Sequence, residues 1–406
     1  MEAGRIGRRI AYWRERRGLT QTDFGRLMGQ AKRWVQDIEG GKRQNDPRLS
    51  VLLRAAEVLR VPLEYLLSDN RPAPTPDMTT PPEVLRVLDA LHLAGTGSDV
   101  PVPPMAGLRR RLVYCCEAFQ ACHYTSLGRE LPGLIRGAEQ LVYDSPANRG
   151  AAARALLSRV YQLTTSYLHK YGPPTATPAA LAADRALNSA ELSGDPVQVG
   201  AAARRVAKSL VYQNRPETAA DFASGYARRL ASELPGRGAV GLSTLGMLYL
   251  SAALAVSSRE RTIDHVRTAS GFIDEAAEVA RRQGADLNED WTMFGRTNVT
   301  LHRVDMLVRF EDGWSALEAA KALTPESIST LKPERRARFH LSKAHAGLLT
   351  RQKEQAADEL LLAHALAPEE VERRPRNTAL VKDTLRVTAI PDSRLRALAG
   401  RCGLRA

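Results

Sequence analysis

The sequence feature that most limits the fold is the stretch 19–42, which encodes two short helices joined by a glycine turn. Thr20 is a favourable helix N-cap residue and Asp23 follows at capping-box spacing, so the sequence predicts a helix over 21–28. Gly29 then supplies the residue that a tight turn needs. The stretch therefore predicts a helix-turn-helix arrangement.

The second helix of this pair is predicted to begin near Ala31 and to point Val35 and Ile38 inward. The first helix is predicted to bury Phe24 and Leu27. The outward face of the second helix then carries four polar side chains, Lys32, Arg33, Gln36 and Asp37. In helix-turn-helix proteins the second helix enters the major groove of DNA, where such groups distinguish base edges. The alternative, a solvated helix face without a ligand, fits less well with a complete motif in a basic segment.

Three more helices complete the predicted N-terminal domain. Apolar residues at helical spacing predict a helix over 6–17 and another over 49–59, and Pro62 is well placed to open a fifth. The loop after the second helix of the motif contains Lys42 and Arg43, which we expect to bind DNA phosphates. Five helices in about 70 residues predict a compact, self-sufficient domain.

Positive charge is concentrated in this predicted domain, residues 1–70. The whole chain has a formal net charge of +13, which suits a polyanionic partner. Residues 1–70 contain 14 Lys/Arg and 9 Asp/Glu, whereas the other 336 residues contain 44 and 36. The net charge per residue is therefore about three times higher in the N-terminal domain, as DNA binding requires.

The motif resembles the phage-repressor-like (XRE) class of helix-turn-helix domains, whose pattern is matched without gaps by Leu19, Thr20, Gln21, Gly29, Val35, Ile38, Glu39 and Gly41. The resemblance implies that Gln21 binds a phosphate. It implies base contacts from the first, second and sixth residues of the recognition helix, Lys32, Arg33 and Asp37. It also implies a partly buried ion pair between Arg14 and Glu39. Gly25 departs from the pattern, because it stands where the family has alanine.

A proline-rich, polar segment follows the N-terminal domain and predicts an extended spacer rather than a helix. We place a linker at 71–104, which contains one short helix near 83–93. This helix packs on either neighbouring domain or takes part in dimerisation, and the sequence leaves these alternatives open.

The remainder of the chain, 105–406, alternates helical segments with short breakers. Alanine, leucine and arginine dominate while aromatic residues make up only 5%, which favours helix over sheet and predicts an all-α protein. The repeat of about 34–45 residues is typical of helical solenoids. The predicted helix pairs are 149–171 with 178–192, 197–212 with 216–234, 240–256 with 262–283, 294–310 with 313–323, and 333–349 with 353–367.

The last of these pairs resembles a tetratricopeptide (TPR) repeat. The repeat's small, small, large, small and proline positions are occupied in order by Ala344, Ala356, Leu360, Ala363 and Pro368. The resemblance implies a TPR-like α-solenoid over 105–406, in which stacked hairpins bury what a single hairpin cannot. A helical core of another kind stays an alternative, since alanine-rich helices occur widely.

A five-helix repressor-like domain followed by a TPR-like solenoid resembles the helix-turn-helix/TPR regulators of Gram-positive bacteria. The segments 333–338 and 367–375 are similar to those of the actinobacterial branch. The resemblance implies a cytoplasmic transcriptional regulator, such as a repressor, that binds a double-stranded DNA operator as a homodimer held by the TPR-like region. It leaves open whether that region also senses a peptide or a small-molecule effector. The alternative is a protein-binding TPR adaptor with a non-regulatory helix-turn-helix module.

The sequence contains none of the common catalytic or nucleotide-binding motifs, so we expect no enzyme, no cofactor and no metal site. The four cysteines lack the spacing of a zinc site and are expected to be buried, reduced thiols: Cys115, Cys116, Cys122 and Cys402. We expect no signal peptide, and no charge-free apolar run long enough to span a membrane.

One predicted helix, 294–310, suggests a ligand site. Four polar residues recur along it at i, i+4, i+7 and i+11, namely Asn298, His302, Asp305 and Arg309. If the solenoid is concave at this point, the stripe is able to bind peptide amides. A polar stripe on a helix is more often a solvated face. The same simpler interpretation applies to three arginine doublets, Arg204-Arg205, Arg228-Arg229 and Arg281-Arg282.

Overall fold

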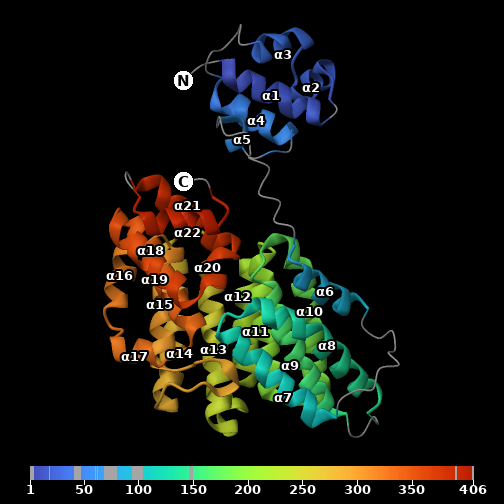
Figure 1. Cartoon of the computed structure of the whole chain (residues 1–406), viewed down its shortest axis with the longest axis vertical. Coiled ribbons are helices and arrows are strands. Elements are labelled where there is room, and N and C mark those ends of the chain that lie inside the picture. Colours follow the sequence, from blue (N-terminus) through green and yellow to red (C-terminus); the bar gives the residue numbers. More distant parts are fainter. Residues whose placement is uncertain are drawn as a thin grey trace. The chain divides into compact units, whose positions relative to one another are not determined.

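The computed structural model describes residues 4–17, 19–40, 47–59, 61, 63–67, 80–93, 104–145, 150–388 and 391–404. Its internal contacts divide the chain into two compact units, 1–79 and 80–406. Helices make up nearly all of the regular structure in these residues (Figure 1), and the single β pairing among them is an isolated bridge between Leu287 and Phe294. The all-α prediction is confirmed.

The first unit consists of short helices around a small apolar core. Its helices are α1 (Gly4–Arg16), α2 (Gln21–Met28), α3 (Lys32–Glu39), α4 (Leu49–Leu59) and α5 (Glu64–Leu67). The predicted capping box is present, because the Thr20 side chain accepts from the backbone N–H of Asp23, whose carboxylate accepts from the Thr20 N–H. Gly29 ends α2 at φ 69°, a left-handed conformation that glycine adopts without strain.

The prediction that α2 buries Leu27 is wrong, since 48% of that side chain is exposed. The buried residues of α2 are Phe24 and Gly25, so the inward face of the helix lies to one side of the predicted stripe. Gly25 explains the shift, because a Cβ at this position would lie 2.8 Å from the carbonyl oxygen of Gln30. The glycine therefore allows the turn to pack directly on α2, where an alanine would push it away.

The second unit contains the helices α6 (Pro82–His92), α7 (Met105–Gln120), α8 (Tyr124–Tyr143), α9 (Ala151–Leu168), α10 (Ala176–Ser193), α11 (Pro196–Tyr212), α12 (Pro216–Leu230), α13 (Gly238–Val256), α14 (Ile263–Gln283), α15 (Arg296–Arg309), α16 (Gly313–Ala320), α17 (Pro325–Ser329), α18 (Pro333–Leu349), α19 (Lys353–Leu366), α20 (Pro368–Glu372), α21 (Pro375–Val387) and α22 (Ser393–Arg401). Short 3₁₀ helices are η1 (Pro173–Thr175), η2 (Leu234–Arg237) and η3 (Glu289–Trp291).

Most consecutive helices of the second unit pack side by side, and their colours follow one another around the fold in Figure 1. The five predicted pairs are present as α9 with α10, α11 with α12, α13 with α14, α15 with α16, and α18 with α19. The fold is therefore the expected helical solenoid. The short helix expected in the linker is α6, which packs mainly on α8 and so lies in the second unit.

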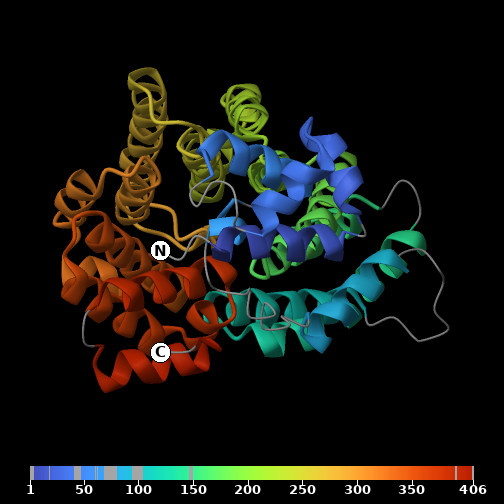
Figure 2. The same cartoon turned by 90° about the horizontal axis from the view of Figure 1, so that it is seen from above.

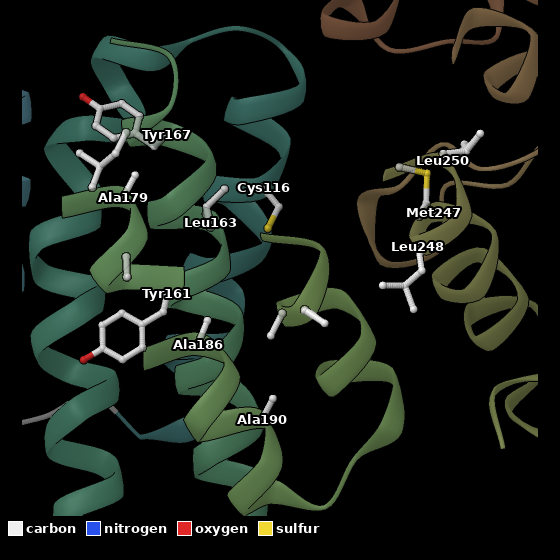
Figure 3. Close-up of a cluster of buried hydrophobic side chains, with 14 of the residues drawn as sticks. Cys116, Tyr161, Leu163, Tyr167, Ala179, Ala186, Ala190, Met247, Leu248 and Leu250 are labelled. Atoms are coloured by element: carbon white, nitrogen blue, oxygen red, sulfur yellow. The ribbon is translucent and has the colours of Figure 1, made fainter. Parts of the chain in front are cut away.

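Small residues allow the helices of each pair to approach closely. Ala179, Ala186 and Ala190 on α10 are fully buried, and Figure 3 shows them beside the large side chains Tyr161 and Tyr167 of α9. In the last predicted pair, the residues expected to be packed between helices are also fully buried: Ala344, Ala356, Leu360 and Ala363. Alternating large and small side chains thus fill the layers without gaps.

Two expectations about apolar residues have different outcomes. Cys115, Cys116 and Cys122 are buried and unbonded, as expected, whereas Cys402 is only partly buried. The expected lack of a long charge-free apolar run is wrong, because 234–256 contains a helix that is long and apolar enough to cross a membrane. In this structure 67% of its most apolar window is buried, and α13 packs against α11, α12 and α14.

The two ends of the solenoid meet through a buried charge cluster, which we call the closure cluster: Tyr124, Lys170, Glu334, Glu370 and Arg374. The Lys170 ammonium lies 3.0 Å from Glu334 Oε1 and 2.8 Å from Glu370 Oε2. Tyr124 donates to Glu370 at 2.6 Å, and Arg374 pairs with the same carboxylate at 2.7 Å. Helices α8 and α9 thereby hold α18 and α20, and Figure 2 shows teal and red segments side by side.

Candidate functional site

Helix α3 presents a polar face from a firmly packed base. Val35 and Ile38 are 0% and 4% exposed and anchor the helix in the core of the first unit. The side chains predicted to contact DNA point away from that core: Lys32, Arg33 and Gln36 are exposed and Asp37 is half-buried. The structure therefore places these four residues along one accessible helix face, as base reading requires.

A buried ion pair fixes α3 against α1. Arg14 Nε donates to Glu39 Oε1 at 2.6 Å and Arg14 Nη2 to Glu39 Oε2 at 3.1 Å, and both side chains are less than a tenth exposed. The hydrogen bond to Glu39 raises the pKa of Arg14 above its ordinary value. The predicted Arg14–Glu39 contact is thus present with two parallel hydrogen bonds, the strong geometry for an arginine–carboxylate pair.

The other predicted DNA contacts have different positions. Gln21 begins α2, and its amide Nε2 donates to Glu39 Oε2 at 2.8 Å. In this structure the amide is therefore held by the same carboxylate that binds Arg14. Lys42 and Arg43 lie outside the described residues. Trp34 is half-buried and packs against the core of the first unit.

The second unit contains a partly open cavity of about 400 Å³. Side chains from α7, α9, α11, α13, α15, α18 and α21 line it. Three of the four residues of the predicted ligand stripe, His302, Asp305 and Arg309, are among them. The fourth, Asn298, is fully buried beside Met247 Sδ and the carbonyl of Thr292 and does not line this cavity.

The stripe on α15 is not a solvated face, because Asn298, His302 and Asp305 are at most 4% exposed. Burial, together with Arg338 and Arg335, lowers the pKa of His302 well below 6.5, so the imidazole is neutral at pH 7. Its Nδ1 lies 2.8 Å from the Asn298 carbonyl oxygen, which can only accept, so Nδ1 donates.

Asp305 is the one acid of the stripe. Burial opposes its ionisation, but Arg338 and Arg309 lower the pKa of Asp305 well below 3.8. Its carboxylate pairs directly with Arg338, and its Oδ2 lies 3.5 Å from Arg309 Nε. The acid therefore positions two cations at the wall of the cavity.

The predicted arginine doublets differ in environment. Arg228, Arg229, Arg281 and Arg282 are exposed, which confirms the solvated interpretation for these two doublets. Arg204 and Arg205 are half-buried on α11 and line the cavity, so that interpretation is wrong for the remaining doublet.

Comparison with known proteins identifies the first unit. Residues 5–66 match the family model of a helix-turn-helix domain. The helix-turn-helix domain spans α1 to most of α5 and includes Arg14, Gln21 and the exposed face of α3. The family match covers this unit alone.

A similarity search of solved structures finds PlcR of Bacillus thuringiensis, crystallised in complex with the peptide PapR7 and DNA. The two chains are 14% identical, the match covers 89% of this chain and 98% of PlcR, and the TM-score is 0.37. No curated protein matches the sequence significantly.

Sequence reasoning missed most of the residues that line the cavity. Besides Arg204 and Arg205, the cavity has eight basic residues that sequence reasoning did not connect, one on the same helix and the others elsewhere in the chain: Lys208, Arg159, Lys170, Lys332, Arg335, Arg338, Arg374 and Arg376. They are up to about 220 positions apart, so no motif spacing connects them. The sequence signal that could have indicated this basic lining is the recurrence of Lys and Arg in successive predicted helical hairpins.

Proposed function

We propose that the protein is a cytoplasmic transcriptional regulator that binds a DNA operator through its helix-turn-helix domain. The observation that carries the proposal is the polar face of α3, with Lys32, Arg33 and Gln36 exposed above the buried anchors Val35 and Ile38. Arginine and lysine donate to guanine O6 and N7, and glutamine pairs with adenine. The proposal includes two finer points: the helix-turn-helix domain belongs to the phage-repressor class, and the protein belongs to the actinobacterial branch of these regulators.

The remaining predicted contacts have supporting roles in this proposal. Asp37 accepts from cytosine N4, and Lys42 and Arg43 bind phosphates on either side of the groove. Gln21 reaches a phosphate from the first turn of α2 while the bond to Glu39 keeps its side chain extended. The Arg14–Glu39 pair holds α3 at a constant angle to α1.

We expect the regulator to act as a homodimer. A single short recognition helix buries too little surface for specific binding, whereas two copies reading half-sites one helical turn apart multiply the affinity. In this proposal the second unit supplies the dimer contact. Light scattering coupled to size exclusion should give about twice the 44.5 kDa chain mass. A monomer at concentrations that saturate the operator would contradict this part of the proposal.

The prediction for base reading concerns Arg33. Replacing Arg33 with alanine should reduce discrimination at one operator position by about 1–3 kcal/mol, because a bidentate contact to guanine is lost. Replacing Lys42 should instead weaken binding to all sequences alike and reduce the salt slope by about 1. Both effects are measured by fluorescence anisotropy against an operator selected from random DNA, across a salt titration.

Arg54→Ala is the matched control, because Arg54 is exposed on α4 and forms a surface ion pair with Glu57 at 2.9 Å. This variant should bind like the original protein. If Arg33→Ala weakens every sequence equally, Arg33 does not read a base. If the original protein prefers no sequence over random DNA at any salt concentration, the operator proposal fails and the protein-binding adaptor becomes the better explanation.

A further inference from the structure

The cavity of the second unit has a large excess of positive charge. Eleven lysines and arginines line it, against the three carboxylates Asp305, Glu334 and Asp383. Two more carboxylates, which do not line the cavity themselves, pair with lining residues: Asp290 with Arg159 at 2.9 Å and Glu370 with Lys170 at 2.8 Å. With these five acids counted, the described residues around this cavity have an excess of six positive charges.

The uncompensated charge is concentrated on α11. Arg204 and Lys208 are one helical turn apart, and within the described chain neither has a hydrogen bond or an ion pair. Arg205 has only a long contact of 3.3 Å to the Gln162 carbonyl oxygen. Burial lowers the pKa of Arg204 and of Lys208 well below their ordinary values, and nearby arginines lower both further. Cations in such a setting are stabilised by an anion that enters the cavity.

Two other helices bring cations to the same space. Arg335 on α18 has a buried Nε without a hydrogen-bond partner, and Arg376 on α21 has no ion pair within the described residues. Arg376 is exposed to solvent by its accessible surface, and the nearby charge of Arg309 is the main cause that lowers the pKa of Arg376 to about 10. The cations thus converge from α11, α15, α18 and α21, which are separate layers of the solenoid. Convergent arginines with free N–H groups are suited to phosphate oxygens.

Apolar and aromatic side chains form one part of the remaining lining, beside uncharged polar residues such as Gln120, Ser251 and Asn377. Met247, Leu254 and Ala255 of α13 contribute to it, and Val308 comes from α15. Trp291 joins them from the loop after α14, and the Arg159 guanidinium lies 5.0 Å from the centre of its ring. Asp290, Trp291 and Met293 in this loop all have positive φ, a conformation that costs energy in residues other than glycine. This strained loop thus contributes an aromatic ring to the lining of the cavity.

We propose that the cavity binds a small organic molecule with two or more phosphate groups, which lie against α11, α18 and α21, and an aromatic or apolar body against α13 and Trp291. Phosphate is favoured over carboxylate by charge density, because each phosphate monoester carries about −1.5 to −2 at pH 7. A peptide would need several acidic side chains close together to neutralise the same cations, and each carboxylate would bring only one negative charge.

The same geometry couples the ligand to the shape of the solenoid. The cavity touches three members of the closure cluster, Lys170, Glu334 and Arg374. Phosphates that bridge α11 and α18 would draw together layers that otherwise repel each other electrostatically. If the protein is the regulator proposed above, this ligand is its effector. That last step rests on the proposed function, whereas binding in the cavity does not.

The test uses the full-length protein and calorimetric titration with three probes: ATP, inorganic tripolyphosphate and a hexa-aspartate peptide, all in metal-free buffer. We expect ATP to bind, tripolyphosphate to bind more weakly, and the peptide to bind least. Arg204→Gln and Lys208→Gln should each weaken ATP binding at least about tenfold, because a charged contact in a desolvated site is lost. Arg282→Gln, at an exposed position of α14, is the matched control and should leave ATP binding unchanged.

Each outcome is decisive because folding and DNA binding are measured on the same samples. Unchanged ATP affinity in both variants, with the thermal transition of the second unit intact, would overturn the proposal. So would tighter binding of the peptide than of ATP, or equal binding of all three probes. If the protein binds an operator but not ATP, the cavity proposal fails and the regulatory function stands. If it binds ATP but no operator, the regulatory function fails and the cavity proposal stands.

Discussion

Replacing Lys170 with methionine is expected to destabilise the second unit by about 3 kcal/mol, because Glu334 and Glu370 lose their shared buried cation. Breaking a buried ion pair costs about 3–5 kcal/mol. We expect the lower value here, because Arg335 and Arg374 still contact these carboxylates. Differential scanning calorimetry of the full chain should show a lower transition temperature for the second unit and no change for the first.

The matched control is Lys321→Met, which removes a Lys–Glu pair with Glu318 on the surface of the same unit. Both of its side chains are more than two-thirds exposed, so the transition temperature should not change measurably. If Lys170→Met and Lys321→Met have the same small effect, the closure cluster does not stabilise the solenoid.

The closure cluster also predicts how stability depends on pH. Burial opposes ionisation of Glu370, but Lys170 and Arg374 lower its pKa below 4.5. Its stabilising contribution is therefore complete above pH 4.5 and is lost as pH falls through the lowered pKa. For Lys170 burial likewise opposes the charge, but the two glutamates raise its pKa above 10.5, so its contribution is complete below that value and is lost at higher pH.

The second large effect concerns the helix-turn-helix domain. Replacing Glu39 with alanine should destabilise this domain by about 3–5 kcal/mol, because Arg14 stays buried without its carboxylate. The Gln21 amide also loses its acceptor. A domain of this size has a total stability of only several kcal/mol, so a large fraction should be unfolded near 37 °C. Operator binding and non-specific DNA binding should both weaken. The midpoint temperature of the calorimetric transition of the helix-turn-helix domain should fall by more than about 10 °C.

Two further variants isolate the cause. Glu57→Ala removes an exposed carboxylate on α4, and it should leave the first transition unchanged. The double variant Arg14→Met with Glu39→Leu removes both charges, and it should be more stable than Glu39→Ala alone because no unpaired charge stays buried. A double variant that is as unstable as the single one would show that packing rather than charge is responsible.

The helix-turn-helix domain was largely predictable from the sequence, because its signals are local. Thr20 with Asp23 gives a capping box within four residues, and Gly29 ends the helix within the same turn. Leu27 was placed wrongly because Gly25 permits a contact with Gln30 that no helical periodicity shows. The direction of a short helix depends on what packs against it.

The cavity was only partly predictable, because it depends on contacts between distant layers. The residue spacing predicted that His302, Asp305 and Arg309 share one side of a helix, but it did not show that this side lines a cavity. The sequence also predicted a solenoid without showing that its ends meet. That meeting depends on Lys170 and Glu370, which are 200 positions apart.

The contact between the ends of the solenoid has a consequence for how this protein can evolve. Open repeat proteins lengthen or shorten by gaining or losing whole repeats, since each repeat contacts only its neighbours. Here an inserted hairpin between α9 and α18 would carry Glu334 and Glu370 away from Lys170 and leave charges buried without partners. Insertions and deletions of repeats should therefore be rejected, and related proteins should acquire new ligands by substitutions inside a cavity of constant size.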